Sequence, residues 1–243
     1  MSMNKSPNFR ETFMQQKIAI KTFALVLALS GVSFIHSAVA SQTVSNDRLA
    51  VDSLNETETV QHPLQAYVNQ LKTFSANFKQ VTPESELFQS PVKTGVFELH
   101  RPGQLVWEYQ KPMGQKILID GENLWVYDQD LEQLTIRPLS DVQADIPLSW
   151  LLFDEKIEER FDILSAGTRN GAQWYNLQPK EATYFQSIEV ALKNHQMVEV
   201  WMYAGPEDIT KVTFSNIASN QTLTPDAFRL QVPESTDIIG QPQ

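Results

Sequence analysis

Hydrophobic and polar residues alternate through most of the chain after residue 72, and a period of two is typical of strands in a half-buried sheet. Phe74, Ala76 and Phe78 form one such row, with polar residues between them. The alternation is interrupted by short turn-forming stretches at residues 101–103, 120–121, 169–171 and 193–196. Alternating runs joined by short turns are typical of antiparallel hairpins. The pattern predicts about 10–11 short strands, the last of them at residues 228–233.

One segment ahead of the strands has helical spacing instead. Leu64, Tyr67, Val68 and Leu71 follow the i, i+3, i+4, i+7 pattern of one helix face. Pro63 stands just before them and suits the first turn of a helix. The segment predicts one amphipathic helix.

A second helical segment interrupts the strands at residues 145–161. Leu148, Leu151 and Leu152 share a helix face, and residues 155–160 continue as a charged helix. A helix in the middle of a meander has to lie over a sheet face or a barrel mouth, so the two helical segments are expected to cover one opening. The fold class is therefore mostly β (α+β), as an antiparallel barrel or one strongly curled sheet.

The first 60 residues are predicted to lie outside this domain. Lys17 and Lys21 precede an apolar run at residues 22–35, and Ala38 and Ala40 occupy the small-residue positions before a cleavage site. A charged region, a short apolar run and such a site predict a secretory signal peptide over residues 1–40. The run is short for a membrane span, which needs about 20 residues. The polar residues 41–60 predict a flexible tail, and residues 61–243 a single domain.

Charge and cysteine content narrow the function classes. The chain carries a net charge of −10, and residues 1–40 carry +3, so the remainder carries −13. Such a surface is repelled by nucleic acid and by anionic lipid surfaces, which argues against nucleic-acid binding. The chain has no cysteine. It therefore has no disulfide and no thiol to which a lipid anchor could be attached.

Catalytic motifs are absent from the sequence. It contains no G-x-S-x-G, no H-E-x-x-H and no Gly-rich phosphate loop. Glu98 and Glu108 could form a glycosidase-like pair across a hairpin, but alternation puts them on the polar face, as solvated carboxylates. The charged residues 154–160 are interpreted as a solvent-facing helix rather than a metal site. The sequence predicts no enzyme, no cofactor and no metal.

The strands on either side of residues 101–103 present a strongly apolar face. This face could be an ordinary core or the lining of a cavity, and the pattern alone leaves both open. Alternation and helical spacing select the candidate binding residues Phe78, Phe97, Leu99, Leu105, Trp107, Ile119 and Ile136 on strands and Leu148 and Leu151 on the helical segment.

The same region resembles the outer-membrane lipoprotein carrier family, the periplasmic LolA chaperones of Gram-negative bacteria. Order and spacing are kept over residues 74–152, and residues 210–233 resemble the last strands of the family more loosely. The matching residues are Phe74, Phe78, Gln80, Gly95, Leu99, Arg101, Pro102, Trp107, Pro112, Asp120, Gly121, Leu124, Trp125, Tyr127, Leu131, Gln133, Leu139, Pro147, Leu151 and Leu152.

The resemblance implies an incompletely closed antiparallel β-barrel with a helical lid, whose cavity takes up acyl chains. It implies that Leu105 and Trp107 line that cavity and that Arg101 holds the lid closed. The implied partners are acylated lipoproteins, an inner-membrane ABC lipoprotein-release complex and an outer-membrane receptor lipoprotein. The receptor carries a lipid-bearing cysteine, so the absence of cysteine here indicates the soluble periplasmic carrier, expected to be a monomer.

Two other function classes stay open on the sequence. One is a periplasmic lipid-binding sensor or regulatory domain with the same half-barrel fold. The other is an enzyme acting on lipid or glycan substrates through Glu98 and Glu108.

Overall fold

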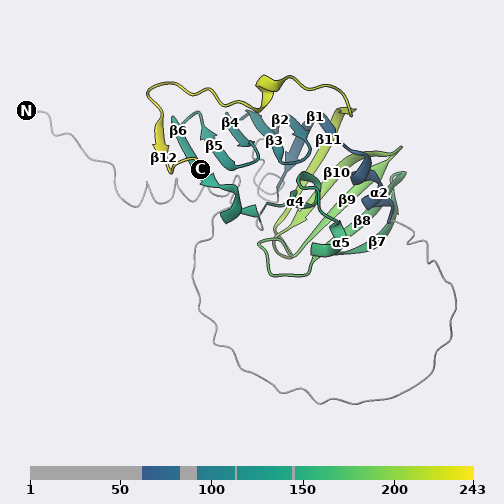
Figure 1. Cartoon of the computed structure of the whole chain (residues 1–243). Helices are drawn as coiled ribbons and strands as arrows, with labels where there is room; N and C mark the ends of the chain where they lie inside the picture. The colour runs from purple at the N-terminus through teal and green to yellow at the C-terminus, as the bar shows by residue number, and fades with distance from the viewer. Residues whose placement is uncertain (1–61, 83–91, 113, 144–145) are drawn as a thin grey trace, which may run out of the picture.

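The computed structural model describes residues 62–82, 92–112, 114–143 and 146–243 (Figure 1). The predicted signal peptide (residues 1–40) and polar tail (residues 41–60) lie outside the described residues. All the elements discussed below belong to the predicted domain.

The described chain is dominated by one large sheet. Its strands are β1 (Thr73–Val81), β2 (Lys93–His100), β3 (Gln104–Lys111), β4 (Gln115–Ile119), β5 (Asn123–Asp128), β6 (Gln133–Pro138), β7 (Phe161–Arg169), β8 (Ala172–Pro179), β9 (Ser187–Lys193), β10 (Gln196–Tyr203), β11 (Ile209–Ser219) and β12 (Asp237–Ile239). The expected alternation is present: along β1 the buried Phe74, Ala76 and Phe78 alternate with more exposed residues.

The sheet is open and almost entirely antiparallel. The strand order is β12-β6-β5-β4-β3-β2-β1-β11-β10-β9-β8-β7, so β1 and β11 are central neighbours and β12 and β7 are the edges. Only β12 runs parallel to its neighbour, β6. Figure 1 shows the sheet curving around the helices without closing. The predicted mostly β, incompletely closed architecture is confirmed.

The helices gather on one side of this curved sheet (Figure 1). They are α2 (Pro63–Gln70), η1 (Leu139–Asp141), α4 (Ser149–Leu152) and α5 (Ile157–Arg160). The C-terminal η3 (Pro225–Phe228) lies on the other face, where Phe228 packs with Val106 and Leu118. The predicted first helix is confirmed as α2, with Pro63 in its first turn. His62 caps it, because the ring Nδ1 accepts a hydrogen bond from the backbone N–H of Leu64 at 3.3 Å.

The prediction of one continuous helix over residues 145–161 is wrong. The segment forms two single turns, α4 and α5, separated by extended backbone at Phe153 and Lys156. The break leaves the Phe153 carbonyl free of helical bonding, and that carbonyl accepts a hydrogen bond from Arg101 instead. Helical spacing in the sequence continues past Leu152, but α4 ends there and the next carbonyl bonds to Arg101 from a distant turn.

The predicted strand over residues 228–233 is also wrong. Residues 225–228 form η3, the chain then runs without regular structure, and the last strand is the three-residue β12 at the sheet edge. In Figure 1 this segment, drawn in yellow, runs from the end of β11 along the sheet to β12 beside β6. Phe228 and Leu230 pack on the sheet, so the segment is held by side-chain burial rather than by strand pairing.

The two faces of the sheet carry separate hydrophobic clusters. The inner face, which looks toward α2, α4 and α5, contributes to one large interior cluster that also includes buried residues of those helices. The outer face carries three smaller clusters: two lie under the C-terminal segment, and the third is centred on Trp174.

Candidate functional site

The interior cluster contains most of the predicted binding residues. Phe78, Phe97, Leu99, Leu105, Trp107, Ile119, Leu148 and Leu151 all belong to it, and each is at most 3% exposed. Five neighbouring elements supply them, because β1 to β4 stand side by side in the sheet and α4 lies over it. The structure therefore brings these eight residues together beneath the helices.

Aromatic rings form the centre of the cluster. Trp107 meets the ring of Phe97 and the ring of Phe78 edge to face, with ring centroids 5.4 Å apart in each pair. Phe74 meets Phe97 and Phe214 in the same way. Edge-to-face contacts of this kind add about 0.5–1.5 kcal/mol per pair to the burial of the rings, and so the rings form a cohesive apolar surface.

Gly95 makes this arrangement possible on β2. It pairs directly with Phe78 on β1 and with Tyr109 on β3. A Cβ atom at residue 95 would lie 1.8 Å from the Glu108 carbonyl oxygen and 2.8 Å from the Phe78 ring. The missing side chain lets the aromatic rings cross β2 at close range.

Ile136 does not lie with the other predicted residues. It pairs with Trp125 across β5 and β6, and both join the outer-face cluster that the C-terminal segment covers. The sequence prediction is wrong for this residue because β6 is buried on its outer face. The apolar residues of β6, Leu134 and Ile136, lie on the outer face. On the inner face, Arg137 of β6 pairs with Leu124 of β5.

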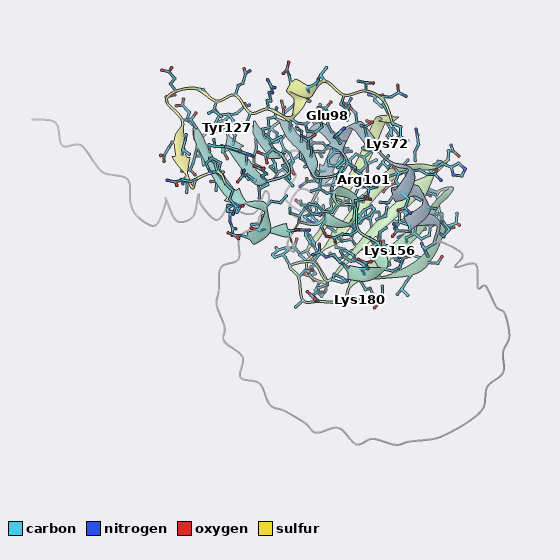
Figure 2. All side chains as sticks on the ribbon, viewed as in Figure 1. Lys72, Glu98, Arg101, Tyr127, Lys156 and Lys180 are labelled. Atoms are coloured by element: carbon cyan, nitrogen blue, oxygen red, sulfur yellow. The ribbon has the colours of Figure 1, made fainter. Side chains whose placement is uncertain are left out.

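Arg101 links the sheet to the helices. Its Nη1 donates to the carbonyls of Val68 and, at 3.2 Å, Leu71 at the end of α2, and its Nη2 donates to the carbonyl of Phe153 after α4 at 2.8 Å. Asp154 adds a carboxylate 3.6 Å away. The Arg101 side chain is only 7% exposed. Figure 2 shows Arg101 in the crowded middle of the molecule, whereas Lys156 and Lys180 lie toward the end that carries α5.

Burial lowers the pKa of the Arg101 guanidinium, and the Asp154 carboxylate partly opposes this shift. Because an arginine stays charged inside proteins, the shift signals the cost of burying the charge rather than its loss. The carbonyl partners offset part of that cost. These bonds exist only while α2 and the end of α4 remain against the sheet.

The turn between β2 and β3 positions Arg101. The Arg101 backbone N–H donates to the Lys72 carbonyl at 2.8 Å, and the Gly103 N–H donates to the Leu152 carbonyl at 3.0 Å. Gly103 has a φ of 88°, which favours glycine. The turn is thus bonded to both helical pieces, and the Arg101 side chain reaches between them.

Further polar contacts that sequence reasoning missed hold the helices together. Gln65 on α2 is 3% exposed, and its Oε1 accepts a hydrogen bond from the Ile157 N–H of α5 at 2.6 Å. Asn220 follows β11; its Oδ1 accepts from the Lys72 N–H at 2.7 Å, and its Nδ2 donates to the Gln70 carbonyl at 3.0 Å. The only sequence signal for Gln65 is its position as a polar residue inside an amphipathic helix. No sequence signal indicates Asn220.

A polar group also lies among the inner-face aromatics and was missed. The Tyr109 hydroxyl donates to Gln80 Oε1 at 2.8 Å, and both side chains are buried. Gln115, the cross-strand partner of Tyr109, is 7% exposed. Gln80 and Gln115 lie at strand ends, where the alternating pattern gives no sign that a polar side chain is buried.

The carboxylates considered for catalysis lie on the outer face. Glu108 pairs across the strands with Lys116, and their charged atoms are 3.5 Å apart. Glu98 pairs with Val106, which belongs to an outer-face cluster. Burial raises the pKa of Glu98, Lys116 lowers it and Glu108 raises it. The pair therefore faces away from the interior cluster.

Metal and membrane features were searched over the part of the chain that the structure describes. There, no group of three or more histidine or acidic residues is arranged to hold a metal ion. None of the helices in the described ranges has the length and apolar character needed to cross a membrane.

The fold and the site define an open antiparallel half-barrel with an aromatic interior and a helical cover that one arginine ties to the sheet. The chain belongs to the outer membrane lipoprotein carrier protein LolA family, whose model matches residues 69–231.

Individual relatives carry the same description. The chain is 33% identical over 179 residues to an outer-membrane lipoprotein carrier protein of Chromobacterium violaceum, covering 73% of this chain and 85% of that protein. It is 31% identical over 182 residues to one of Cupriavidus necator, covering 73% and 86%. Among solved structures, a LolA superfamily protein from Nitrosomonas europaea matches with a TM-score of 0.38 and 11% identity, over 68% of this chain and 97% of that one.

Proposed function

We propose that this protein is a periplasmic chaperone that binds the acyl chains of lipoproteins released from the inner membrane and carries them to a receptor lipoprotein at the outer membrane. Membership of a lipoprotein carrier family supports the general role. The observation that carries the mechanism is the position of Arg101, which bonds the ends of two helical pieces over an aromatic interior.

The interior is suited to hydrocarbon chains because their burial needs no directional partner. Each buried methylene is worth roughly 0.8 kcal/mol, so a chain of about 16 carbons gains roughly 10 kcal/mol or more on leaving water. The eight predicted residues of the interior cluster, together with Phe74 and Phe214, offer such an environment once the helices move away from the sheet.

Arg101 sets how easily that movement occurs. In the closed form its guanidinium satisfies carbonyls at the ends of α2 and α4. Entry of an acyl chain exchanges these bonds for apolar burial, which makes the lid a two-state device whose equilibrium the ligand shifts. The bonds regained on closing favour release, so that a loaded carrier can still give up its cargo.

The remaining steps of the route follow from the family. We propose that an inner-membrane ABC complex supplies the lipoprotein and that an outer-membrane receptor lipoprotein takes it. Residues 1–40 would direct export to the periplasm, with cleavage near Ala40. The protein binds and releases its cargo without a catalytic step. The sensor-domain alternative is not favoured, because the matching curated relatives are named as carriers.

A release assay tests the function. Purified protein is added with ATP to proteoliposomes that hold newly acylated lipoprotein and the ABC release complex. We expect lipoprotein to appear in the supernatant as a one-to-one complex, only when both protein and ATP are present. If none is released while a known carrier works in the same preparation, the carrier function is wrong.

The Arg101→Leu variant tests the latch. Loss of the charged hydrogen bonds removes what favours the closed form, so loading is expected to persist while transfer to receptor-bearing liposomes falls at least about tenfold. Transfer by Arg101→Lys is also expected to fall, because the ammonium group of lysine lacks the planar arrangement of N–H donors with which the guanidinium binds several carbonyls. Arg169→Leu is the matched control, because Arg169 lies on the outer face against Trp174 and Glu189. Normal transfer by Arg101→Leu would contradict the latch.

A further inference from the structure

Several buried polar atoms have no hydrogen-bond partner among the described residues, and two of them lie on the neighbouring strands β3 and β4 of the inner face. They are Nε1 of Trp107 and Oε1 of Gln115. Trp107 is 3% exposed and Gln115 is 7% exposed. A buried polar atom without a partner lowers the stability of a folded protein, so two of them on neighbouring strands call for a reason.

The two side chains are neighbours through Tyr109. Gln115 on β4 pairs directly with Tyr109 on β3, and Trp107 is two residues from Tyr109 on the same strand. The rings of Trp107 and Tyr109 lie nearly parallel, with an interplanar angle of 16° and centroids 6.2 Å apart. Because side chains two apart along a strand share a face, all three point toward the interior cluster.

Tyr109 itself already has a partner. Its hydroxyl donates to Gln80, and burial raises its pKa while that bond lowers it. The hydroxyl therefore stays protonated and engaged. The indole N–H of Trp107 and the amide oxygen of Gln115 are the groups left to bond something else: one donor and one acceptor.

This polar group lies far along the strands from Arg101. Arg101 follows His100, which pairs with Thr73 at the start of β1, whereas Gln80 stands near the end of β1. Gln115 is the first residue of β4, opposite the end of β3. The latch and the polar group thus belong to opposite ends of the interior.

An acyl chain alone would leave both atoms unsatisfied. The linkage that joins the chain to its head group can bond them. An ester or amide carbonyl accepts from the indole N–H of Trp107, and the N–H of an amide linkage donates to the Gln115 oxygen. We propose that Trp107 binds the carbonyl of an ester or amide linkage of an acylated ligand and that Gln115 binds the N–H of an amide linkage, so that the interior recognises a polar linkage as well as hydrocarbon. This inference rests on the proposed carrier function.

The chain offers a matched control. Trp174 is also 3% exposed with an unpartnered Nε1, but it belongs to the outer-face cluster with Ala172 and Ala191. Trp107→Phe and Trp174→Phe delete the same N–H group on opposite faces of the sheet. Only the first should change recognition of a linkage.

Binding is measured by titration of the full-length protein with a synthetic lipopeptide whose two palmitoyl chains are ester-linked, and with its ether-linked analogue, which lacks the carbonyls. We expect Trp107→Phe to weaken binding of the ester probe about tenfold, as for one lost hydrogen bond, and to leave binding of the ether probe unchanged. Trp174→Phe should change neither. Ester-linked phosphatidylglycerol in a third titration tells whether a phospholipid provides the same linkage.

Gln115→Met tests the acceptor at nearly constant size. It should weaken binding of an N-acylated lipopeptide and spare the same peptide with its acyl amide N-methylated. Equal losses for ester and ether probes, or for both amide probes, would overturn the inference, since the residues would then act by packing alone. Wild-type protein that binds none of the probes would instead contradict the carrier function itself.

Discussion

At the residue scale, the apolar interior depends on Gly95, a position that cannot hold a side chain. Gly95 has no Cβ, and this absence lets the Phe78 ring and the β3 backbone approach β2 from either side. The alternation of hydrophobic residues around it predicts a strand, but nothing in that pattern signals the close approach. Gly95 is among the residues that match the carrier family, but only the distances in the structure show why a side chain is excluded there.

The first prediction concerns this close approach. Gly95→Ala is expected to lower the free energy of unfolding by about 3 kcal/mol, because the new methyl group meets backbone that cannot move aside. Urea denaturation followed by tryptophan fluorescence measures the change. Gly205→Ala is the control, since a Cβ there would meet only the Asp208 Cβ at 3.9 Å. Equal stability of the two variants would show that β2 has more room than the structure indicates.

At the element scale, the helical cover is held by its buried apolar side chains and by polar contacts to its ends. The α2 helix has eight residues, which is too short to be stable alone in water. His62 caps its start, and Asn220 and Arg101 bond the carbonyls at its end. Gln65 ties it to α5. These hydrogen bonds fix the ends of α2 against the rest of the molecule, in addition to the burial of its apolar face.

The second prediction is a pH dependence of the α2 cap. Burial lowers the pKa of His62 below 6.5, although Glu158 opposes the shift. Since the unfolded chain takes up the proton more readily, this contribution to stability is complete above pH 6.5 and is lost as the pH falls through the lower folded pKa. Protonation also removes the Nδ1 acceptor that caps α2.

His62→Asn keeps a capping side chain without a titratable ring. The wild-type free energy of unfolding should fall between pH 7.5 and pH 5, and the decrease should be smaller in His62→Asn. His195→Asn is the control, because His195 lies exposed in the turn before β10 with a φ of 59° that asparagine tolerates. An unchanged pH profile in His62→Asn would rule out this role for His62.

At the scale of the whole molecule, the sheet is covered on both faces by parts of the chain distant in sequence. The helices lie on the inner face, and the C-terminal segment crosses the outer face to pair as β12 with β6. Its last residue is also held, because the Gln243 N–H donates to Asn123 Oδ1 at 2.9 Å. The outer face of β3 to β6 therefore carries a second core beneath this segment.

The third prediction tests that second core. Replacing both Phe228 and Leu230 by alanine should lower the free energy of unfolding by about 4 kcal/mol, because both side chains pack on the outer face. Replacing Ile238 and Ile239 by alanine in the same segment should cost less than about 1 kcal/mol, since they are 56% and 47% exposed. Chemical denaturation of the two double variants gives the comparison. Equal losses would mean that strand pairing, and not burial, holds the segment.

Much of the fold was predictable because strands and turns are local. Alternation placed the hairpins of β1 to β6 and β7 to β11, and helical spacing placed α2. Hydrophobic spacing failed at residues 145–161, where the bond from Arg101 ends α4, and at residues 228–233, where burial replaces pairing. In both places a distant part of the chain decides the local conformation.

The sequence by itself determined the class of fold, the row of apolar residues on β1 to β4 and, through its likeness to a family, the position of Arg101 at a turn. Only the tertiary structure decided which face each row occupies. It places Ile136 on the outer face, and it brings Gln65 to α5 and Asn220 to the end of α2. It also leaves polar atoms of Trp107 and Gln115 without a partner on the inner face. The physical reason is that alternation defines two faces of a strand, whereas the packing of distant segments determines what covers each.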